Sequence, residues 1–251
     1  MNAIVIREFG SPEVLKVEAV ETPSVGPTQV LVKVKAVGVN PVDTYLRTGV
    51  YPKLPPLPYT PGKDSAGVVE AIGSDVREFK SGDRVYTSGS LTGTYAEFTL
   101  CEERDAARLP DNITFEQGAG VWTPYATAFR ALFQKAKAAS GDTVLVHGAS
   151  GGVGLAAVQW AKGAGISVIG TASSAAGLDL IRANGADAAF DHSDEGHLDA
   201  ILEYTGGIGV DVIIEMLANE NLERDFKTLA MFGRIVIVGS RGSLEFSPRL
   251  T

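Results

Sequence analysis

The sequence predicts an α/β protein in which an antiparallel β domain, residues 1–113, precedes a doubly wound parallel sheet, residues 114–251. Most of the 12 prolines lie before residue 62. Proline donates no backbone hydrogen bond, so this half favours loop-rich antiparallel strands over a buried parallel sheet. After Thr114, short Val- and Ile-rich runs alternate with helical segments, which is typical of a parallel sheet covered by helices. A glycine-rich turn joins the first of these runs to its helix.

Short Val-rich or alternating runs predict the strands of the N-terminal half. The expected strands are Ala3–Arg7, Leu15–Ala19, Val30–Val39, Ala66–Ile72 and Tyr95–Leu100. Segments rich in Gly and Pro separate them and predict turns. We expect bulges or turns at Gly67, Gly73 and Gly82.

The C-terminal half begins with a predicted helix cap at Thr114, because Gln117 follows three residues later. An amphipathic helix is predicted over Ala126–Ala138. The expected strands are Thr143–His147, Ser167–Gly170, Ala188–Asp191, Val210–Glu215 and Arg234–Gly239. The expected helices are Val153–Gly163, Ala175–Asn184, His197–Tyr204 and Leu222–Ala230. Gly185 is expected to end its helix in the left-handed conformation.

Composition places the chain among ordinary globular proteins. It has 251 residues, 45% of them hydrophobic and 21% charged, which excludes a disordered or coiled-coil chain. The net charge of −8 argues against a broad nucleic-acid surface, although a local patch with Lys33, Lys35 and Arg47 stays open. Cys101 is the single cysteine, so neither an intrachain disulfide nor a four-cysteine zinc site can form. The sequence shows no leader and no membrane-spanning run, and we expect a cytoplasmic protein.

The glycine-rich turn is the strongest chemical signal. His147 ends a strand and runs directly into Gly148-Ala149-Ser150-Gly151-Gly152-Val153-Gly154, where an apolar helix begins. Small residues let a pyrophosphate approach the backbone, and the free N–H groups of a helix start point at its oxygens. We expect a dinucleotide site, with Gly154 allowing the helix to lie close to the sheet. The alternative is a tight turn that binds nothing.

The second strand indicates which dinucleotide is bound. An NAD site places Asp or Glu near the end of this strand to hold the ribose 2′-hydroxyl. Here the strand ends at Gly170 and is followed by small and hydroxyl residues, with no acid before Asp179. A missing carboxylate removes repulsion toward a 2′-phosphate, and the Ser173 hydroxyl can donate to it. The pattern favours NADP, but without Arg or Lys at the turn it does not settle the choice.

Several motifs along the chain together resemble the quinone oxidoreductase/zeta-crystallin branch of the medium-chain dehydrogenases. These motifs are Gly38–Tyr45, Pro58–Gly62, Gly82–Val85, Gly141–Gly154 followed by Gln159 and Lys162, Ile214–Asn219 and Val238–Gly242. The resemblance implies a GroES-like β domain, a Rossmann domain and an active site in the cleft. It also implies NADPH-dependent one-electron reduction of quinones without zinc.

The resemblance also implies the site residues. It assigns Ser150, Gly151, Gly152 and Val153 to the pyrophosphate, and Ser173 and His192 to the adenosine end. It assigns Asn221, Val238, Gly239, Ser240 and Arg241 to the nicotinamide half, Tyr45 to a cofactor contact, and Asn40 and Tyr51 to the substrate cleft. No catalytic acid is implied. His192 and Arg241 are alternatively ordinary loop residues, and Tyr51 alternatively only packs.

Zinc is not expected. Zinc alcohol dehydrogenases of the same superfamily have Cys where Asn40 stands and Gly-His-Glu where Gly62-Lys63-Asp64 stands. None of the three histidines can join Cys101 in an obvious ligand set. We therefore expect no metal site.

The sequence departs from the family in ending at Thr251, whereas members continue into a sixth Rossmann strand and segments that complete the β domain. We therefore expect a Rossmann domain truncated after about its fifth strand. Relatives form homo-oligomers through the missing edge, so association, solubility and activity of the short chain are expected to suffer. We expect NADPH binding to be weakened but retained.

Two other functions stay open at this point. One is NADPH-dependent reduction of an enone or alkenal, because the same cleft suits an activated alkene. The other is a catalytically weak NADPH- and RNA-binding protein similar to a lens crystallin. The sequence does not determine the exact small-molecule substrate.

Overall fold

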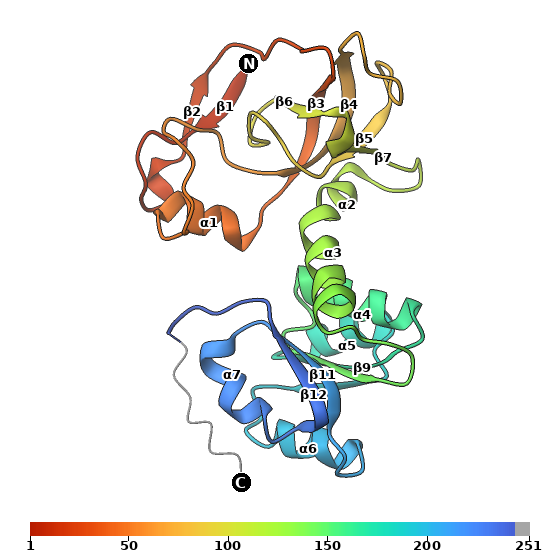
Figure 1. The fold of residues 1–251 in the computed structure, drawn as a ribbon. Helices are drawn as coiled ribbons and strands as arrows, with labels where there is room; N and C mark the ends of the chain where they lie inside the picture. Colours follow the sequence, from red (N-terminus) through yellow and green to blue (C-terminus); the bar gives the residue numbers. More distant parts are fainter. Residues whose placement is uncertain (244–251) are drawn as a thin grey trace. The chain divides into compact units, whose positions relative to one another are not determined.

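The computed structural model describes residues 1–243 and divides into two compact units, Met1–Thr123 and Pro124–Thr251 (Figure 1). Helix α2 (Phe115–Ala119) contacts strands β3 and β4, which places it in the first unit. The contacts therefore divide the chain ten residues after the expected boundary at 113/114. Thr114 caps α2 as expected, because its hydroxyl accepts from the Gln117 amide at 3.2 Å.

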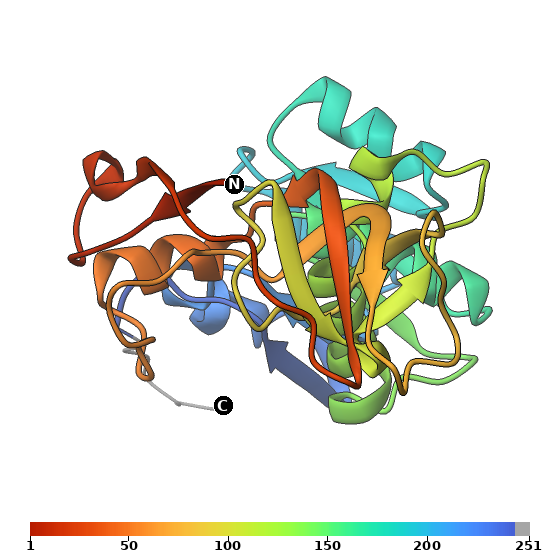
Figure 2. The ribbon, with the colours of Figure 1, turned by 90° about the horizontal axis from the view of Figure 1, so that it is seen from above.

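The first unit is built on an antiparallel sheet of five strands in the order β6-β3-β4-β5-β7. Figure 2 shows β3 in red between β6 in yellow and β4 in orange. These strands are β3 (Gln29–Gly38), β4 (Asp64–Ile72), β5 (Arg84–Thr87), β6 (Phe98–Glu102) and β7 (Ala106–Arg108). A two-stranded sheet joins β1 (Asn2–Val5) to β2 (Lys16–Ala19), and helix α1 spans Pro41–Thr48. Short 3₁₀ turns lie at Pro12–Val14 and Glu103–Asp105.

Local packing explains where the expected strands of this unit were right or wrong. A β-carbon at Gly67 would lie 2.2 Å from the Lys33 carbonyl oxygen, beside a register shift in the β3–β4 ladder, which confirms the expected bulge. Gly82 has φ +92° in a turn, also as expected. The strand expected at Tyr95–Leu100 was wrong by three residues, because Thr94 and Tyr95 instead donate backbone bonds to Pro61.

The second unit is a parallel sheet of five strands in the order β10-β9-β8-β11-β12, which confirms the doubly wound prediction. The strands are β8 (Thr143–Val146), β9 (Ser167–Ala172), β10 (Ala188–Asp191), β11 (Val210–Glu215) and β12 (Leu229–Ile237). The helices are α3 (Trp122–Phe129), followed by a π-helical turn Arg130–Lys135, then α4 (Gly152–Gly163), α5 (Ala175–Ala183), α6 (His197–Tyr204) and α7 (Ala218–Asp225).

Alternate residues of the buried strands pack on opposite faces of this sheet. Val144 and Val146 of β8 belong to the core that includes α3, α4 and α5. Leu145 between them packs with Leu198 and Ile201 of α6 on the other face. Both faces are therefore covered by helices, as a parallel sheet requires. Among residues 1–243, no helix is long and apolar enough to cross a membrane.

Two expected helices differ from the structure. The helix expected at Leu222–Ala230 is α7 at Ala218–Asp225, because Leu229 and Ala230 instead begin β12. The helix expected at Ala126–Ala138 begins at Trp122 and ends in the π-helical turn. Gly185 has φ +108° after α5, which confirms the expected left-handed position.

Candidate dinucleotide-binding site

The loop between β8 and α4 is held tightly against the neighbouring strand. The Gly148 amide donates to the Thr171 hydroxyl at 3.2 Å, and the Ala149 amide donates to the Thr171 carbonyl at 2.7 Å. A β-carbon at Gly154 would lie 2.5 Å from the Ala149 Cα and from the Gly148 carbonyl oxygen. Only glycine therefore fits at position 154, which confirms the expected close approach of the helix.

The same loop presents unpaired backbone donors. Within the described part of the chain, the amides of Gly152, Val153 and Gly154 have no hydrogen-bond partner, as the first turn of a helix predicts. Gly151 and Gly152 are exposed. The positive end of the α4 dipole lies at these amides. The loop fits a pyrophosphate in both donor supply and steric access.

The turn after β9 carries hydroxyls and no carboxylate. Ser173 is exposed at the end of β9, and Ser174 caps α5 through a 3.2 Å bond from the Gly177 amide. The first acid beyond the turn, Asp179, lies within α5 and accepts from Arg182 at 3.2 Å. The Ser173 hydroxyl is therefore the polar side chain that this turn offers to a ligand.

His192 follows β10, and its ring is linked to β9. Its amide donates to the Ala172 carbonyl at 3.0 Å, and its Nδ1 lies 3.2 Å from the Thr171 hydroxyl. Partial burial lowers the pKa of His192, and the nearby His147 and His197 lower it further. The ring is therefore a neutral imidazole at neutral pH.

A second group of expected cofactor residues lies at the carboxyl ends of β11 and β12. The Glu215 carboxylate accepts from the Asn221 side-chain amide at 3.1 Å, and the Glu215 backbone carbonyl accepts from the Val238 amide at 2.8 Å. Asn219 accepts from the Ser240 hydroxyl at 3.2 Å and from the Arg241 amide at 2.8 Å. Gly239 accepts from the Ala218 amide at 3.0 Å. These bonds bring Asn221 and the segment 238–241 together at one edge of the sheet.

Two carboxylates and a histidine are buried beneath these loops. His147 Nε2 lies 2.9 Å from an Asp225 oxygen and 3.6 Å from a Glu215 oxygen. Burial lowers the pKa of His147, but the hydrogen bond to Asp225 and the charges of both carboxylates outweigh it and raise the pKa. Burial, together with the neighbouring Asp225 carboxylate, raises the pKa of Glu215 to about 7, although His147 opposes this shift. The cluster therefore retains protons near neutrality.

In the first unit, Asn40 is buried at the start of α1 and is engaged with acidic residues. Its side-chain amide donates to Asp64 at 3.1 Å, and its backbone amide donates to Asp43 at 2.9 Å. Asp64 also accepts from the Thr123 hydroxyl at 2.8 Å and from the Thr123 amide at 3.0 Å. Burial raises the pKa of Asp43. Hydrogen-bond donors thus satisfy Asp64, which stands in the Gly-His-Glu position of zinc relatives.

Tyr45 and Tyr51 also lie in the first unit. Tyr45 is on α1 with 36% of its surface exposed, and Tyr51 follows the helix with 40% exposed. Among the described residues, neither hydroxyl has a hydrogen-bond partner, so both are free for a ligand. Asn40, Tyr45 and Tyr51 all belong to the first unit, whereas the glycine-rich loop belongs to the second.

Both units match families of dehydrogenases. Residues 26–111 match the alcohol dehydrogenase GroES-like domain, and residues 152–250 match the zinc-binding dehydrogenase family. The human quinone oxidoreductase is 49% identical over 252 residues, which cover 100% of this chain and 77% of that protein. The Pseudomonas aeruginosa quinone oxidoreductase is 40% identical over 92% of this chain and 71% of its own length.

The chain belongs to the quinone oxidoreductase family. Solved structures agree with this assignment. An Escherichia coli quinone oxidoreductase complexed with NADPH matches with a TM-score of 0.87 and 33% identity over 98% of this chain and 75% of its own. An NAD-dependent alcohol dehydrogenase matches with a TM-score of 0.91 and 33% identity over 98% and 80%. The same fold therefore occurs in a protein solved with NADPH and in one named as NAD-dependent.

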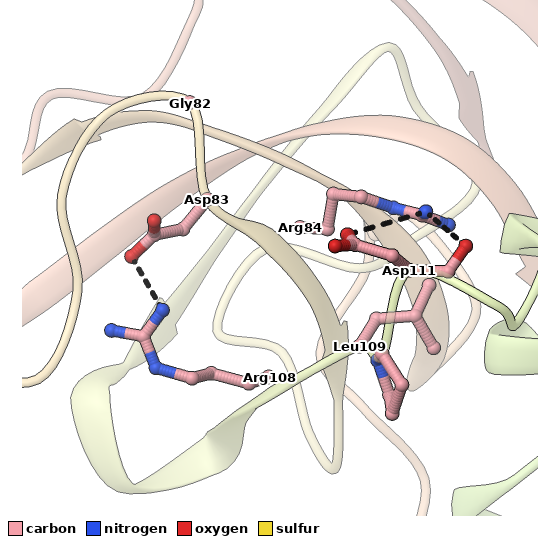
Figure 3. Close-up of a pocket in the computed structure, with 7 residues that line it drawn as sticks. Gly82, Asp83, Arg84, Arg108, Leu109 and Asp111 are labelled. Atoms are coloured by element: carbon pink, nitrogen blue, oxygen red, sulfur yellow. Dashed lines mark hydrogen bonds and ion pairs between the residues drawn. The ribbon is translucent and has the colours of Figure 1, made fainter.

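A pocket on the first unit does not include the residues of the expected site. It is lined by Gly82, Asp83, Arg84, Arg108, Leu109, Pro110 and Asp111 (Figure 3). Arg108 pairs with Asp83 at 3.1 Å, and Arg84 donates to the Asp111 carbonyl at 3.0 Å. Its cations are therefore committed to partners within the protein, and none of the expected site residues lines it.

The motifs of the quinone oxidoreductase family did not single out four residues that hold the site together. Thr171, Glu215, Asn219 and Asp225 were not proposed from the sequence. The run Ile214–Asn219 contributed to the resemblance, but its bonds to Asn221 and to residues 238–241 depend on how two strand ends meet. Asp225 lies 78 residues from His147, and no local pattern connects them.

Proposed function

We propose that this chain binds NADPH and uses it to reduce quinones. The observation that carries the proposal is the unpaired amide donors of Gly152 and Val153, next to a turn at Ser173 that lacks a carboxylate. The first feature suits a pyrophosphate and the second suits a 2′-phosphate. The quinone oxidoreductase relatives, including one whose structure was solved with NADPH, support the same reading.

Each expected residue takes a binding role in this proposal. Ser150, Gly151, Gly152 and Val153 hold the pyrophosphate, Ser173 and His192 hold the adenosine end, and Asn221, Val238, Gly239, Ser240 and Arg241 hold the nicotinamide half. Tyr45 contacts the cofactor, and Asn40 and Tyr51 contact the quinone. NADPH supplies the reducing electrons, and the protein supplies orientation and exclusion of water. No side chain is assigned as a general acid.

We also propose that the reaction needs no zinc. Asn40 is a poor zinc ligand compared with Cys, and Asp64 is satisfied by three hydrogen bonds. Cys101 lies on β6, is fully buried, and donates to the Val30 carbonyl. Burial raises the pKa of its thiol to about 12, so the thiolate that zinc prefers is not formed.

The RNA-binding alternative has weaker support. Of the cations considered for a basic patch, Lys33 lies over the Phe98 ring and Arg47 donates to the Gly10 carbonyl. The net charge of −8 opposes the approach of a polyanion.

We also propose a cytoplasmic location. The free, buried thiol of Cys101 is consistent with a reducing compartment.

The deciding experiment follows NADPH oxidation with a panel of benzoquinones, naphthoquinones, enones and alkenals, with NADH as the matched control. We expect NADPH to be oxidised with quinones and more slowly with enones, and NADH to be a poorer donor. Faster turnover of enones than of quinones would reassign the substrate class. Absence of NADPH oxidation with every acceptor, together with salt-sensitive retention of RNA, would replace the proposal with the binding-protein alternative.

A further inference from the structure

A continuous chain of polar contacts connects the buried cluster to His192. Thr171 lies at its centre on β9, which neighbours β8 and β10 in the sheet. Its hydroxyl lies 3.2 Å from the Gly148 amide, 3.4 Å from His147 Nδ1 and 3.2 Å from His192 Nδ1. Thr171 is fully buried, so no solvent competes for these three contacts.

The donors and acceptors of this chain can be counted. A hydroxyl has one hydrogen to donate and two lone pairs that accept. The Gly148 amide can only donate, so it uses one lone pair of the Thr171 oxygen. His147 Nε2 faces Asp225 at 2.9 Å and must carry a hydrogen to bond that carboxylate. The remaining question is whether His147 Nδ1 also carries one.

The charges around His147 answer that question. Asp225 from α7 and Glu215 from β11 both face its ring, and Arg224 of α7 opposes them with a smaller effect. The net result is a raised pKa, which favours an imidazolium with hydrogens on both nitrogens. His147 Nδ1–H then uses the second lone pair of the Thr171 oxygen, and the hydroxyl hydrogen is left for His192 Nδ1.

This count fixes the tautomer of His192. A neutral imidazole that accepts at Nδ1 carries its single hydrogen at Nε2. Within residues 1–243, no protein group bonds to His192 Nε2. We propose that His147 and Thr171 are positioning residues that hold His192 as an Nε2–H donor toward the phosphate or ribose oxygens at the adenosine end of NADPH. This inference rests on the proposed NADPH site for its ligand and on hydrogen-bond geometry for the tautomer.

Two variants separate this role from simple packing. Thr171→Val keeps the shape of the side chain and removes the hydroxyl, whereas Thr171→Ser keeps the hydroxyl. Thr143→Val is the matched control. Thr143 begins β8, at the end of that strand away from the glycine-rich loop, and its hydroxyl makes no hydrogen bond within the described residues. Circular dichroism and thermal melting report whether each variant folds.

The first measurement is the nitrogen chemical shifts of the histidine rings in the cofactor-free protein. The chain has three histidines, so the signals can be assigned with single substitutions. We expect His192 in the Nε2–H form at pH 7 in the natural protein and in Thr171→Ser, and a mixture of tautomers in Thr171→Val. An Nδ1–H form of His192 in the natural protein, or an unchanged tautomer in folded Thr171→Val, would overturn the proposal.

The second measurement is the dissociation constant of NADPH. Loss of one directed hydrogen bond is expected to weaken binding about threefold to tenfold in Thr171→Val. Thr171→Ser and Thr143→Val should bind as the natural protein does. In the background of His192→Ala, Thr171→Val should have no further effect, and full additivity would contradict action through His192.

The two measurements fail independently. If the natural protein does not bind NADPH, the proposed function is wrong, and the nitrogen shifts still decide whether Thr171 sets the tautomer. If NADPH binds tightly but Thr171→Val leaves both the tautomer and the affinity unchanged, the cofactor assignment stands and the positioning role is wrong.

Discussion

Gly154 in the first turn of α4 lies so close to Ala149 that a β-carbon would stand 2.5 Å from the Ala149 Cα. Neither backbone can move without shifting β8 or α4, so Gly154→Ala should destabilise the protein by about 1–3 kcal/mol. It should also weaken NADPH binding by displacing the loop. Gly163→Ala is the control, because nothing lies within 4 Å of that site at the end of the same helix. Equal melting temperatures for the two variants would contradict this account.

Phe232 is 91% exposed and has φ +64°, a conformation that costs a residue with a β-carbon about 1–2 kcal/mol. Replacing it with glycine should relieve this strain and raise the free energy of unfolding by roughly 0.5–1 kcal/mol. Met231→Gly is the control, since Met231 is 84% exposed without a positive φ. That variant should lose stability in denaturant titrations, and a loss in Phe232→Gly would refute the strain argument.

Glu215 should make stability depend on pH. A carboxyl whose pKa is raised in the folded state stabilises that state at low pH and loses this contribution as pH rises through the folded value, here about 7. His147 acts in the same direction, because its pKa is also raised. The stability of Glu215→Gln relative to the natural protein should therefore increase from pH 5 to pH 8. The expected change in the free energy of unfolding is on the order of 1–3 kcal/mol, and the melting temperature should rise with it.

Glu203→Gln on the exposed side of α6 is the control for this titration. Its melting temperature should follow that of the natural protein at every pH. Parallel curves for Glu215→Gln and the natural protein would show that Glu215 titrates at the same pH in the folded and unfolded states.

Ser173→Asp should reverse the cofactor preference. A carboxylate after β9 repels a 2′-phosphate but accepts from a 2′-hydroxyl, so NADPH should bind about tenfold or more weakly and NADH more tightly. Ser173→Ala is the control that removes the hydroxyl without adding charge. Titration of both dinucleotides measures the effect, and unchanged dissociation constants would mean that the adenosine end binds elsewhere.

Chelation should leave activity unchanged. Because Asp64 accepts hydrogen bonds from both Asn40 and Thr123, we expect purified protein to hold no stoichiometric zinc and to reduce quinones equally with and without a chelator. Metal analysis before and after dialysis is the measurement. Loss of zinc together with loss of turnover, and recovery of both on adding zinc back, would refute the zinc-free proposal.

The sequence predicted the parallel sheet well because its strands are buried on both faces. The strand Val210–Glu215, with the apolar run Val212, Ile213 and Ile214 at its centre, was placed with the correct bounds. The short strands β5 and β7 and the helix α1 were not predicted. Each has only three to eight residues, and pairing with distant partners decides their conformation.

In the candidate site, too, features set by neighbouring residues in the sequence were predicted, and features set by distant contacts were not. The glycine-rich turn between β8 and α4 was predicted because strand, turn and helix are contiguous in sequence. The contacts of Thr171 with His147 and His192 were not, since they arise where three separate strands end side by side. Asp225 was placed inside an expected helix that had no reason to contact His147. Burial of its carboxylate is a property of the folded sheet.

The strand order also sets a sequence of events during synthesis. β8 emerges first and becomes the middle of the sheet, with β9 and β10 added on one side and β11 and β12 on the other. The ribosome thus delivers Thr171 and His192 before the acidic partners of His147, one of which lies 78 residues downstream of it. Until that second half is in place, His147 lacks the two carboxylates that raise its pKa in the folded protein. The raised pKa of His147 is thus a property of the completed sheet.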